Sequence, residues 1–147
     1  MEKFAFMIHP IELSDIYRKL KFMEKMPDSI VESIIKKIPP LKVSHITGVK
    51  SQYSETEGWF VGCPLTTKQM IELPEEYVIN KIIQTGKLAE KLGAKILGLG
   101  AFTAVVGDAG ITIAKNLNIP VTTGNSYTVA TAIEGTKKAS KIMGKDL

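Results

Sequence analysis

The stretch Ile96–Met143 constrains the fold of this chain more than any other part of its sequence. It reads as a strand that ends in a turn of small residues, a short helix, a second strand, a polar Thr-Thr-Gly-Asn-Ser turn and a closing helix. Two strand-to-helix turns in succession are typical of an open α/β sheet, which binds ligands at the carboxyl ends of its strands. The stretch therefore predicts a ligand-binding edge, and the remaining sequence is expected to form its scaffold.

The preceding sequence alternates between apolar runs and amphipathic stripes, as α/β folds do. Strands are expected at 4–8, 43–49, 58–63, 95–99 and 121–123. Helices are expected from about Ser14, after Pro27, from Pro74 to Gly93, at 109–117 with Asp108 as a cap, and from Asn125 or Ser126 to Gly144. The first strand is a continuous apolar run and is expected to be buried on both faces. The second and third strands either form a hairpin or remain unpaired. The sequence thus predicts one α/β domain with a mainly parallel open sheet flanked by helices.

Composition excludes several classes of function. The chain has 147 residues, a net charge of +4 and 44% hydrophobic residues, which is typical of one soluble domain. Its lysines are scattered and no basic stripe alternates with aromatic residues, so nucleic-acid binding is not expected. One cysteine and two distant histidines permit no disulfide and indicate no metal site. No apolar run reaches the ~20 residues of a membrane span, and no signal peptide is recognisable, so a cytoplasmic protein is expected.

The turn Gly98-Leu-Gly100-Ala-Phe102-Thr103 has the first two glycines of a dinucleotide-binding fingerprint. Thr103 replaces the third glycine, and no acidic residue follows about 20 positions later to bind a ribose. Asp108, at the start of the next predicted helix, would repel a phosphate. The turn is therefore interpreted as a tight turn beside a crevice instead of a cofactor site.

The turn Thr122–Ser126 is better suited to a ligand. Free backbone N–H groups at a helix start, with hydroxyl and amide side chains nearby, can bind a carboxylate, a carbonyl or a phosphate. Alternatively, Asn125 or Ser126 only caps the helix and Gly124 only supplies a positive φ angle. The sequence is compatible with both interpretations.

Cys63 lies at the end of a predicted strand and is a candidate thiol nucleophile. Activation would require a neighbouring cation or base such as His9 or His45. An isolated cysteine on an apolar strand is more often part of the core. His9, at the end of the first strand, is expected to line the crevice, whereas His45 is expected to face solvent.

Taken together, Gly98–Val106 and Thr122–Thr128 resemble the N-terminal domain of the cyanobacterial long-chain acyl-(acyl-carrier-protein) reductases. They are equally similar to bacterial relatives described as amino-acid or shikimate-type dehydrogenases. Ile8-His9, Pro39-Pro40 before a strand, and a cysteine at the end of the strand Phe60–Cys63 also match. The similarity runs in order along the whole chain.

The resemblance implies that residues 1–147 are the substrate-side domain of a two-domain oxidoreductase. In that family a Rossmann domain, which follows directly, binds NADP or NAD, so no cofactor and no hydride transfer are expected of this chain alone. The resemblance also implies a substrate that is a small molecule or an acyl thioester. The crevice would be walled by Gly100, Phe102, Thr103, Thr122, Thr123, Gly124, Asn125 and Thr128. Cys63 is not expected to carry the acyl group, and the final helix would pack on the cofactor domain.

Two other functions remain open at the level of sequence. One is a stand-alone module that binds a small ligand or supports assembly, without redox activity. The other is a cysteine-dependent acyl-transfer enzyme that uses Cys63, which would react rapidly with thiol reagents. An apolar face left exposed by a missing partner domain would also make the isolated chain form artificial homodimers.

Overall fold

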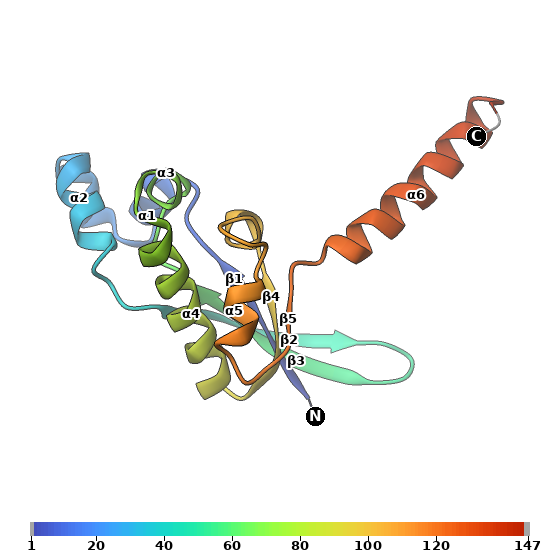
Figure 1. Cartoon of the computed structure of the whole chain (residues 1–147), viewed down its shortest axis with the longest axis horizontal. Coiled ribbons are helices and arrows are strands. Elements are labelled where there is room, and N and C mark those ends of the chain that lie inside the picture. Colours follow the sequence, from blue (N-terminus) through green and yellow to red (C-terminus); the bar gives the residue numbers. More distant parts are fainter. Residues whose placement is uncertain (1, 146–147) are drawn as a thin grey trace.

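The computed structural model describes residues 2–145, which contain a five-stranded sheet with helices packed on one face (Figure 1). The strands are β1 (Lys3–Ile8), β2 (Leu41–Lys50), β3 (Glu55–Gly62), β4 (Ala94–Leu99) and β5 (Val121–Thr122). Their order in the sheet is β2-β3-β1-β4-β5. All neighbours are parallel except β2, which is antiparallel to β3. The predicted α/β class with a mainly parallel sheet is confirmed, and β2 and β3 form the hairpin.

Six α-helices and two short 3-10 helices connect or follow these strands within the described residues. They are α1 (Leu13–Lys19), η1 (Lys21–Lys25), α2 (Asp28–Ile35), α3 (Thr67–Glu72), α4 (Glu75–Lys91), η2 (Ala101–Ala104), α5 (Ile111–Lys115) and α6 (Asn125–Ile142).

Among the described α-helices, only α3 begins with a side-chain cap at its N-cap residue. A capping box of Thr66 and Gln69 opens α3. Asp108 was expected to cap a helix that begins at 109, but α5 begins at Ile111 and its N-cap is Gly110. The Asp108 carboxylate, two residues before the N-cap, still accepts a 3.0 Å hydrogen bond from the backbone N–H of Thr112. Ser14 does not cap α1, because it lies inside the helix and its hydroxyl donates to the Glu12 carboxylate.

The main core lies between α4 and the sheet. Val78 and Ile82 of α4 pack in one cluster with Met7, Val61 and Leu97 of the three central strands, and all five side chains are fully buried. A second, smaller cluster is centred on Met23, Val31 and Ile35 and holds α1, η1 and α2 together. These helices lie beyond the carboxyl ends of the strands (Figure 1).

The expectation that β1 is buried on both faces is wrong. Ala5 and Met7 are 2% and 0% exposed, whereas Phe6, on the opposite face, is 40% exposed. Crossover connections between parallel strands are right-handed, so two crossovers that move along the sheet in opposite directions normally place their helices on opposite faces. Here the β1–β3 connection runs through α1, α2 and the antiparallel β2, so no helix reaches the second face.

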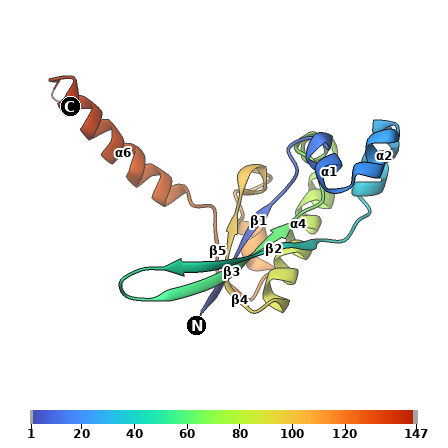
Figure 2. The same ribbon diagram turned by 180° about the vertical axis from the view of Figure 1, so that it is seen from behind.

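The last helix, α6, leaves the body of the molecule (Figures 1 and 2). None of its described residues is buried, and Val129 and Ile133 are 57% and 51% exposed. Within residues 2–145, no helix combines the length and apolar character that a membrane span requires. The apolar side chains of α6 are not buried by any other described part of the chain.

Candidate functional site

The sheet topology marks one place at its carboxyl edge where a ligand is expected. β1 and β4 are neighbours, but the chain leaves β1 towards β3 on one side and leaves β4 towards β5 on the other. Ligands of open α/β sheets bind at such a switch point, outside the carboxyl ends of the two strands. His9 follows β1, and the turn at Gly100–Phe102 follows β4, so the predicted residues meet there.

A hydrogen bond spans the switch point. The backbone N–H of Phe102 donates to Nε2 of His9 at 3.1 Å. Because Nε2 accepts, the neutral ring carries its proton on Nδ1, which lies 2.9 Å from the carbonyl oxygen of Pro10 and donates to it. The imidazole is partly buried and held from both nitrogens. It therefore fixes the turn after β4 against the end of β1.

The loop between β4 and α5 has a strained backbone. Among the described residues, the non-glycine residues with positive φ are Ala101 (49°) and Ala109 (56°), and both lie in this loop. Alanine in this region of φ costs on the order of 1–2 kcal/mol. Such residues cluster at functional sites, which supports the choice of this edge.

Two candidate residues of the loop serve the turn itself. Thr103 is 0% exposed, and its hydroxyl donates to the carbonyl of Gly100 at 2.7 Å. Phe102 is partly buried against the main core. Their side chains therefore shape the turn, and a ligand would meet its exposed backbone near Ala101.

The two glycines of the partial fingerprint accommodate Phe6, not a pyrophosphate. A Cβ at Gly98 would lie 2.7 Å from the Phe6 ring, and one at Gly100 would lie 2.4 Å from the carbonyl oxygen of Met7. The segment after Gly100 is the 3-10 helix η2, and the following α5 has five residues with the Asp108 carboxylate at its start. This turn does not form a dinucleotide cradle, so NADP or NAD does not fit here.

The turn between β5 and α6 forms the adjacent part of the edge. Gly124 has a φ of 75°, and its N–H donates to the Thr122 hydroxyl at 3.1 Å. Gly124 is also the N-cap of α6, which rules out the alternative in which Asn125 or Ser126 caps this helix. The Thr128 hydroxyl donates back to the Gly124 carbonyl at 3.2 Å. The first turn of α6 thus keeps its N–H groups free of any side-chain cap.

The two turns lie close together but are not bonded. The Thr123 methyl group lies 3.8 Å from the position that a Cβ at Gly110 would occupy, so it faces the β4–α5 loop. Within residues 2–145, no hydrogen bond joins the His9 group to the Thr122–Thr128 group. Together they provide backbone N–H groups, hydroxyls and one amide along neighbouring strand ends, which suits a carbonyl or carboxylate.

Cys63 follows β3, and its backbone N–H donates to the carbonyl of Ile8 at 2.9 Å, one residue before His9. The thiol is fully buried, and this burial raises its pKa from 9.0 to about 11, against smaller lowering effects of Leu65, Thr85 and Lys81. The His45 ring instead stacks on Trp59 at 4.0 Å. Both nitrogens of His9 are occupied by Pro10 and Phe102, and among the described residues no hydrogen bond joins a histidine to the thiol. These bonds and the raised pKa weigh against acyl transfer by Cys63.

We expect Cys63 to react slowly with a thiol reagent in the native protein near neutral pH. The rate should rise steeply only as the pH approaches about 11, because the buried thiolate forms there. The ratio of the labelling rate in the urea-unfolded chain to that in the native protein measures how strongly the fold protects Cys63 from the reagent. Equal rates in the two states at neutral pH would contradict the burial of Cys63.

Sequence reasoning missed a cluster of side chains at the outer part of the sheet. Nε2 of His45 lies 3.1 Å from the Glu57 carboxylate, which also pairs with Lys3 at 2.8 Å. The hydrogen bond from Lys3 is the main reason why the pKa of Glu57 is lowered. Nζ of Lys42 lies 4.7 Å from the Trp59 ring. The β1–β3 register pairs Lys3 with Glu57, and the β2–β3 hairpin pairs His45 with Trp59. Patterns of single residues do not predict either register.

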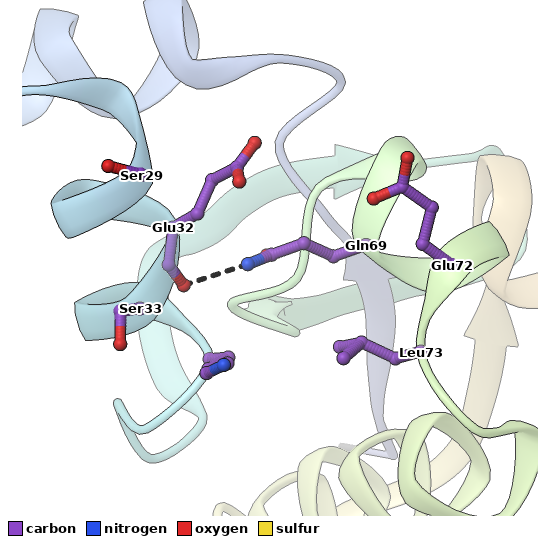
Figure 3. Close-up of a pocket in the computed structure, with 7 residues that line it drawn as sticks. Ser29, Glu32, Ser33, Gln69, Glu72 and Leu73 are labelled. Carbon is purple, nitrogen blue, oxygen red and sulfur yellow. Dashed lines mark hydrogen bonds between the residues drawn. The ribbon is translucent and has the colours of Figure 1, made fainter.

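Sequence reasoning also missed a hollow of about 200 Å³ between α2 and α3 (Figure 3). It is lined by Ser29, Glu32, Ser33, Lys36, Gln69, Glu72 and Leu73. Nε2 of Gln69 donates to the Glu32 carbonyl at 2.8 Å, and Lys68 pairs with the Glu32 carboxylate at 3.0 Å. These contacts join the two helices, and none of the predicted site residues lines the hollow. It is best explained as the seam between α2 and α3.

The fold and its switch point define an α/β domain with a polar edge of exposed turns. No protein-family model matches the chain. Over 136 residues the chain is 27% identical to the aminotransferase PigE of Serratia sp. (strain ATCC 39006). That similarity takes in 86% of this chain and 16% of the relative, so the chain spans a small part of that protein's length.

Proposed function

We propose that the chain is the substrate-side domain of an NAD(P)-dependent reductase or dehydrogenase that acts on an acyl thioester or an amino acid. The observation that carries the proposal is the Phe102 N–H to His9 hydrogen bond at the switch point. It holds two strand ends in the arrangement that open α/β sheets use to bind a ligand. The resemblance of Gly98–Val106 and Thr122–Thr128 to acyl-carrier-protein reductases supplies the reaction class.

In this proposal the edge binds and orients the substrate carbonyl. The uncapped N–H groups at the start of α6 are donors for its oxygen, and the positive end of the helix dipole favours partial negative charge there. Because the turn at Gly98–Thr103 does not fit a nucleotide, the cofactor is assigned to a separate domain. NADP or NAD would supply the hydride, and this chain would supply the substrate wall.

A second candidate is a ligand-binding or assembly module without redox activity. The similarity to part of PigE supports it, because that relative is described as an aminotransferase and not as an oxidoreductase. Such a module would use the same edge for another ligand or for contact with a neighbouring domain. It predicts that the chain binds neither an acyl thioester nor a nicotinamide cofactor.

Calorimetric titration of the chain with a long-chain acyl thioester, and separately with NADPH, distinguishes these functions. We expect the thioester to bind without nucleotide and NADPH not to bind. Thioester binding should weaken about tenfold in His9→Ala, because the turn after β4 loses its fixed position. His45→Ala is the matched control, since the second histidine lies on the hairpin, and it should bind as the natural chain does.

The other results of the titration reject the proposal in different ways. Binding of neither ligand would reject the acyl thioester as substrate. A further titration with amino acids then separates an amino-acid dehydrogenase domain, which binds one of them, from the assembly module, which binds none. Tight binding of NADPH alone would make this chain the cofactor domain. Replacing Thr123, Asn125 and Thr128 together by alanine should also weaken thioester binding about tenfold, and unchanged affinity would remove the β5–α6 turn from the site.

A further inference from the structure

The helix α6 has an apolar stripe that its own chain does not cover. Small and aliphatic residues recur every three or four positions on one side of this 18-residue helix. They are Val129, Ala132, Ile133, Thr136 and Ala139. The opposite side carries Glu134, Lys137, Lys138 and Lys141. We call the first set the α6 stripe. An isolated helix of this length is marginal in water, so the stripe requires a packing partner.

The uncovered side of the sheet is the second unpartnered surface. Phe4 and Phe6 of β1, Phe60 of β3 and Ile96 of β4 lie on it side by side, as the strand register requires. We call these four residues the aromatic face. Phe6 and Ile96 are 40% and 41% exposed, and the Phe6 and Phe60 rings meet edge to face at 6.1 Å. All four side chains are apolar. Because parallel sheets are normally covered on both sides, the aromatic face is expected to be covered by a partner.

The α6 stripe and the aromatic face match in size and shape. An 18-residue helix is about 27 Å long, and strands of six residues are about 20 Å long. The strands β3, β1 and β4 span about 10 Å across the sheet, which is about the diameter of a helix. The alanines of the stripe leave room for the phenylalanine rings, and the lysines of the opposite side would remain in solvent.

The position of α6 favours a second copy over its own sheet. Two residues, Thr123 and Gly124, connect α6 to β5, which is the edge strand. Phe60 lies three strands away on β3, about 14 Å across the sheet. The chain's own α6 could cover β5 and β4 after such a short connection, but it would leave Phe60 exposed. In the structure it points away from the sheet altogether (Figures 1 and 2).

We infer that the aromatic face binds α6 of a second copy of this chain. The result is a two-fold symmetric dimer in which each copy inserts its α6 stripe over the other's sheet. Because of the two-fold symmetry, the contact between an α6 stripe and an aromatic face occurs twice in the dimer. Both surfaces are then covered in both copies. Neither surface includes His9 or the turn after β4, but α6 is shared with the proposed function, in which its first turn binds the substrate. The dimer therefore replaces the packing of α6 on a cofactor domain that the family resemblance implies.

Light scattering of the purified chain tests the dimer. The natural chain is expected to have twice the monomer mass of 16.1 kDa. Ile133→Asp places a charge in the stripe and should raise the dimer dissociation constant at least about 100-fold. Its fold should persist, because Ile133 is exposed in the single copy. Ala130→Asp, on the opposite side of the same helix, is the matched control and should remain dimeric.

Cross-linking between two different chains identifies the occupant. One chain carries Ala132→Cys on α6 and the other carries Ile96→Cys on the aromatic face, and both keep the buried Cys63. Oxidation of the mixture should give a covalent pair that contains one chain of each kind. Three results would each overturn the inference. One is a natural chain that is monomeric, and another is a dimer that Ile133→Asp does not weaken. The third comes from a chain that carries both cysteine changes, if its disulfides form only within single chains.

Discussion

Gly100→Ala is expected to lower the free energy of unfolding by about 3 kcal/mol. The added Cβ would lie 2.4 Å from the Met7 carbonyl oxygen, a distance that real Cβ contacts essentially never show. The same oxygen accepts a hydrogen bond from the Gly100 N–H at 3.0 Å. The end of β4 must therefore move away from β1 to remove this clash, and that movement also disturbs the turn that His9 holds. Urea unfolding monitored by circular dichroism measures the loss.

Two other glycines serve as controls for Gly100. A Cβ at Gly98 would meet the Phe6 ring at 2.7 Å, so Gly98→Ala should cost less, about 1–2 kcal/mol, and should be relieved when combined with Phe6→Ala. Gly135, in α6, has open space around it, and Gly135→Ala should be neutral or stabilise the chain by up to about 1 kcal/mol. If Gly100→Ala is as stable as the natural chain, the close approach of β1 and β4 is wrong.

The same glycines explain what the sequence predicted well and what it did not. The pattern of Gly98 and Gly100 predicted a tight turn at a crevice, and a turn is present. It did not predict that the Phe6 ring restricts Gly98 or that the Met7 carbonyl restricts Gly100, because both contacts depend on the β1–β4 register. Register is set by residues far apart in the chain, and a local pattern does not contain it.

Helix starts were predicted better than the contacts of the site, because helix starts depend on neighbouring residues and the site depends on residues far apart in the chain. Pro74 followed by two glutamates, and Asp108 before α5, are local signals, and the structure places helix starts beside both. His9 and Phe102 were each predicted at the edge, but they are 93 positions apart and their hydrogen bond follows from the strand order. The exposure of one face of β1 was not predicted. An apolar run has the same sequence pattern whether a helix of its own chain or another molecule covers the strand.

Ile82→Ala is expected to lower the free energy of unfolding by about 4 kcal/mol, whereas Ile35→Ala should act locally. Ile82 is fully buried in the main core between α4 and the sheet. Its truncation leaves a cavity that every element of that core shares. Urea unfolding should show one cooperative transition at a lower urea concentration for Ile82→Ala.

Ile35 is equally buried, at 1% exposure, but it belongs to the small cluster of α1, η1 and α2. A few hydrogen bonds connect this cluster to the rest, among them Nζ of Lys81 to the Ile38 carbonyl and the Tyr77 hydroxyl to the Lys36 carbonyl. Ile35→Ala should therefore speed amide hydrogen exchange in α1 and α2 while α4 and the strands stay protected. Uniform loss of protection would contradict two separate units. Because α1 and α2 follow His9 and lie beyond the strand ends, their local opening would widen access to the switch point without unfolding the sheet that carries it.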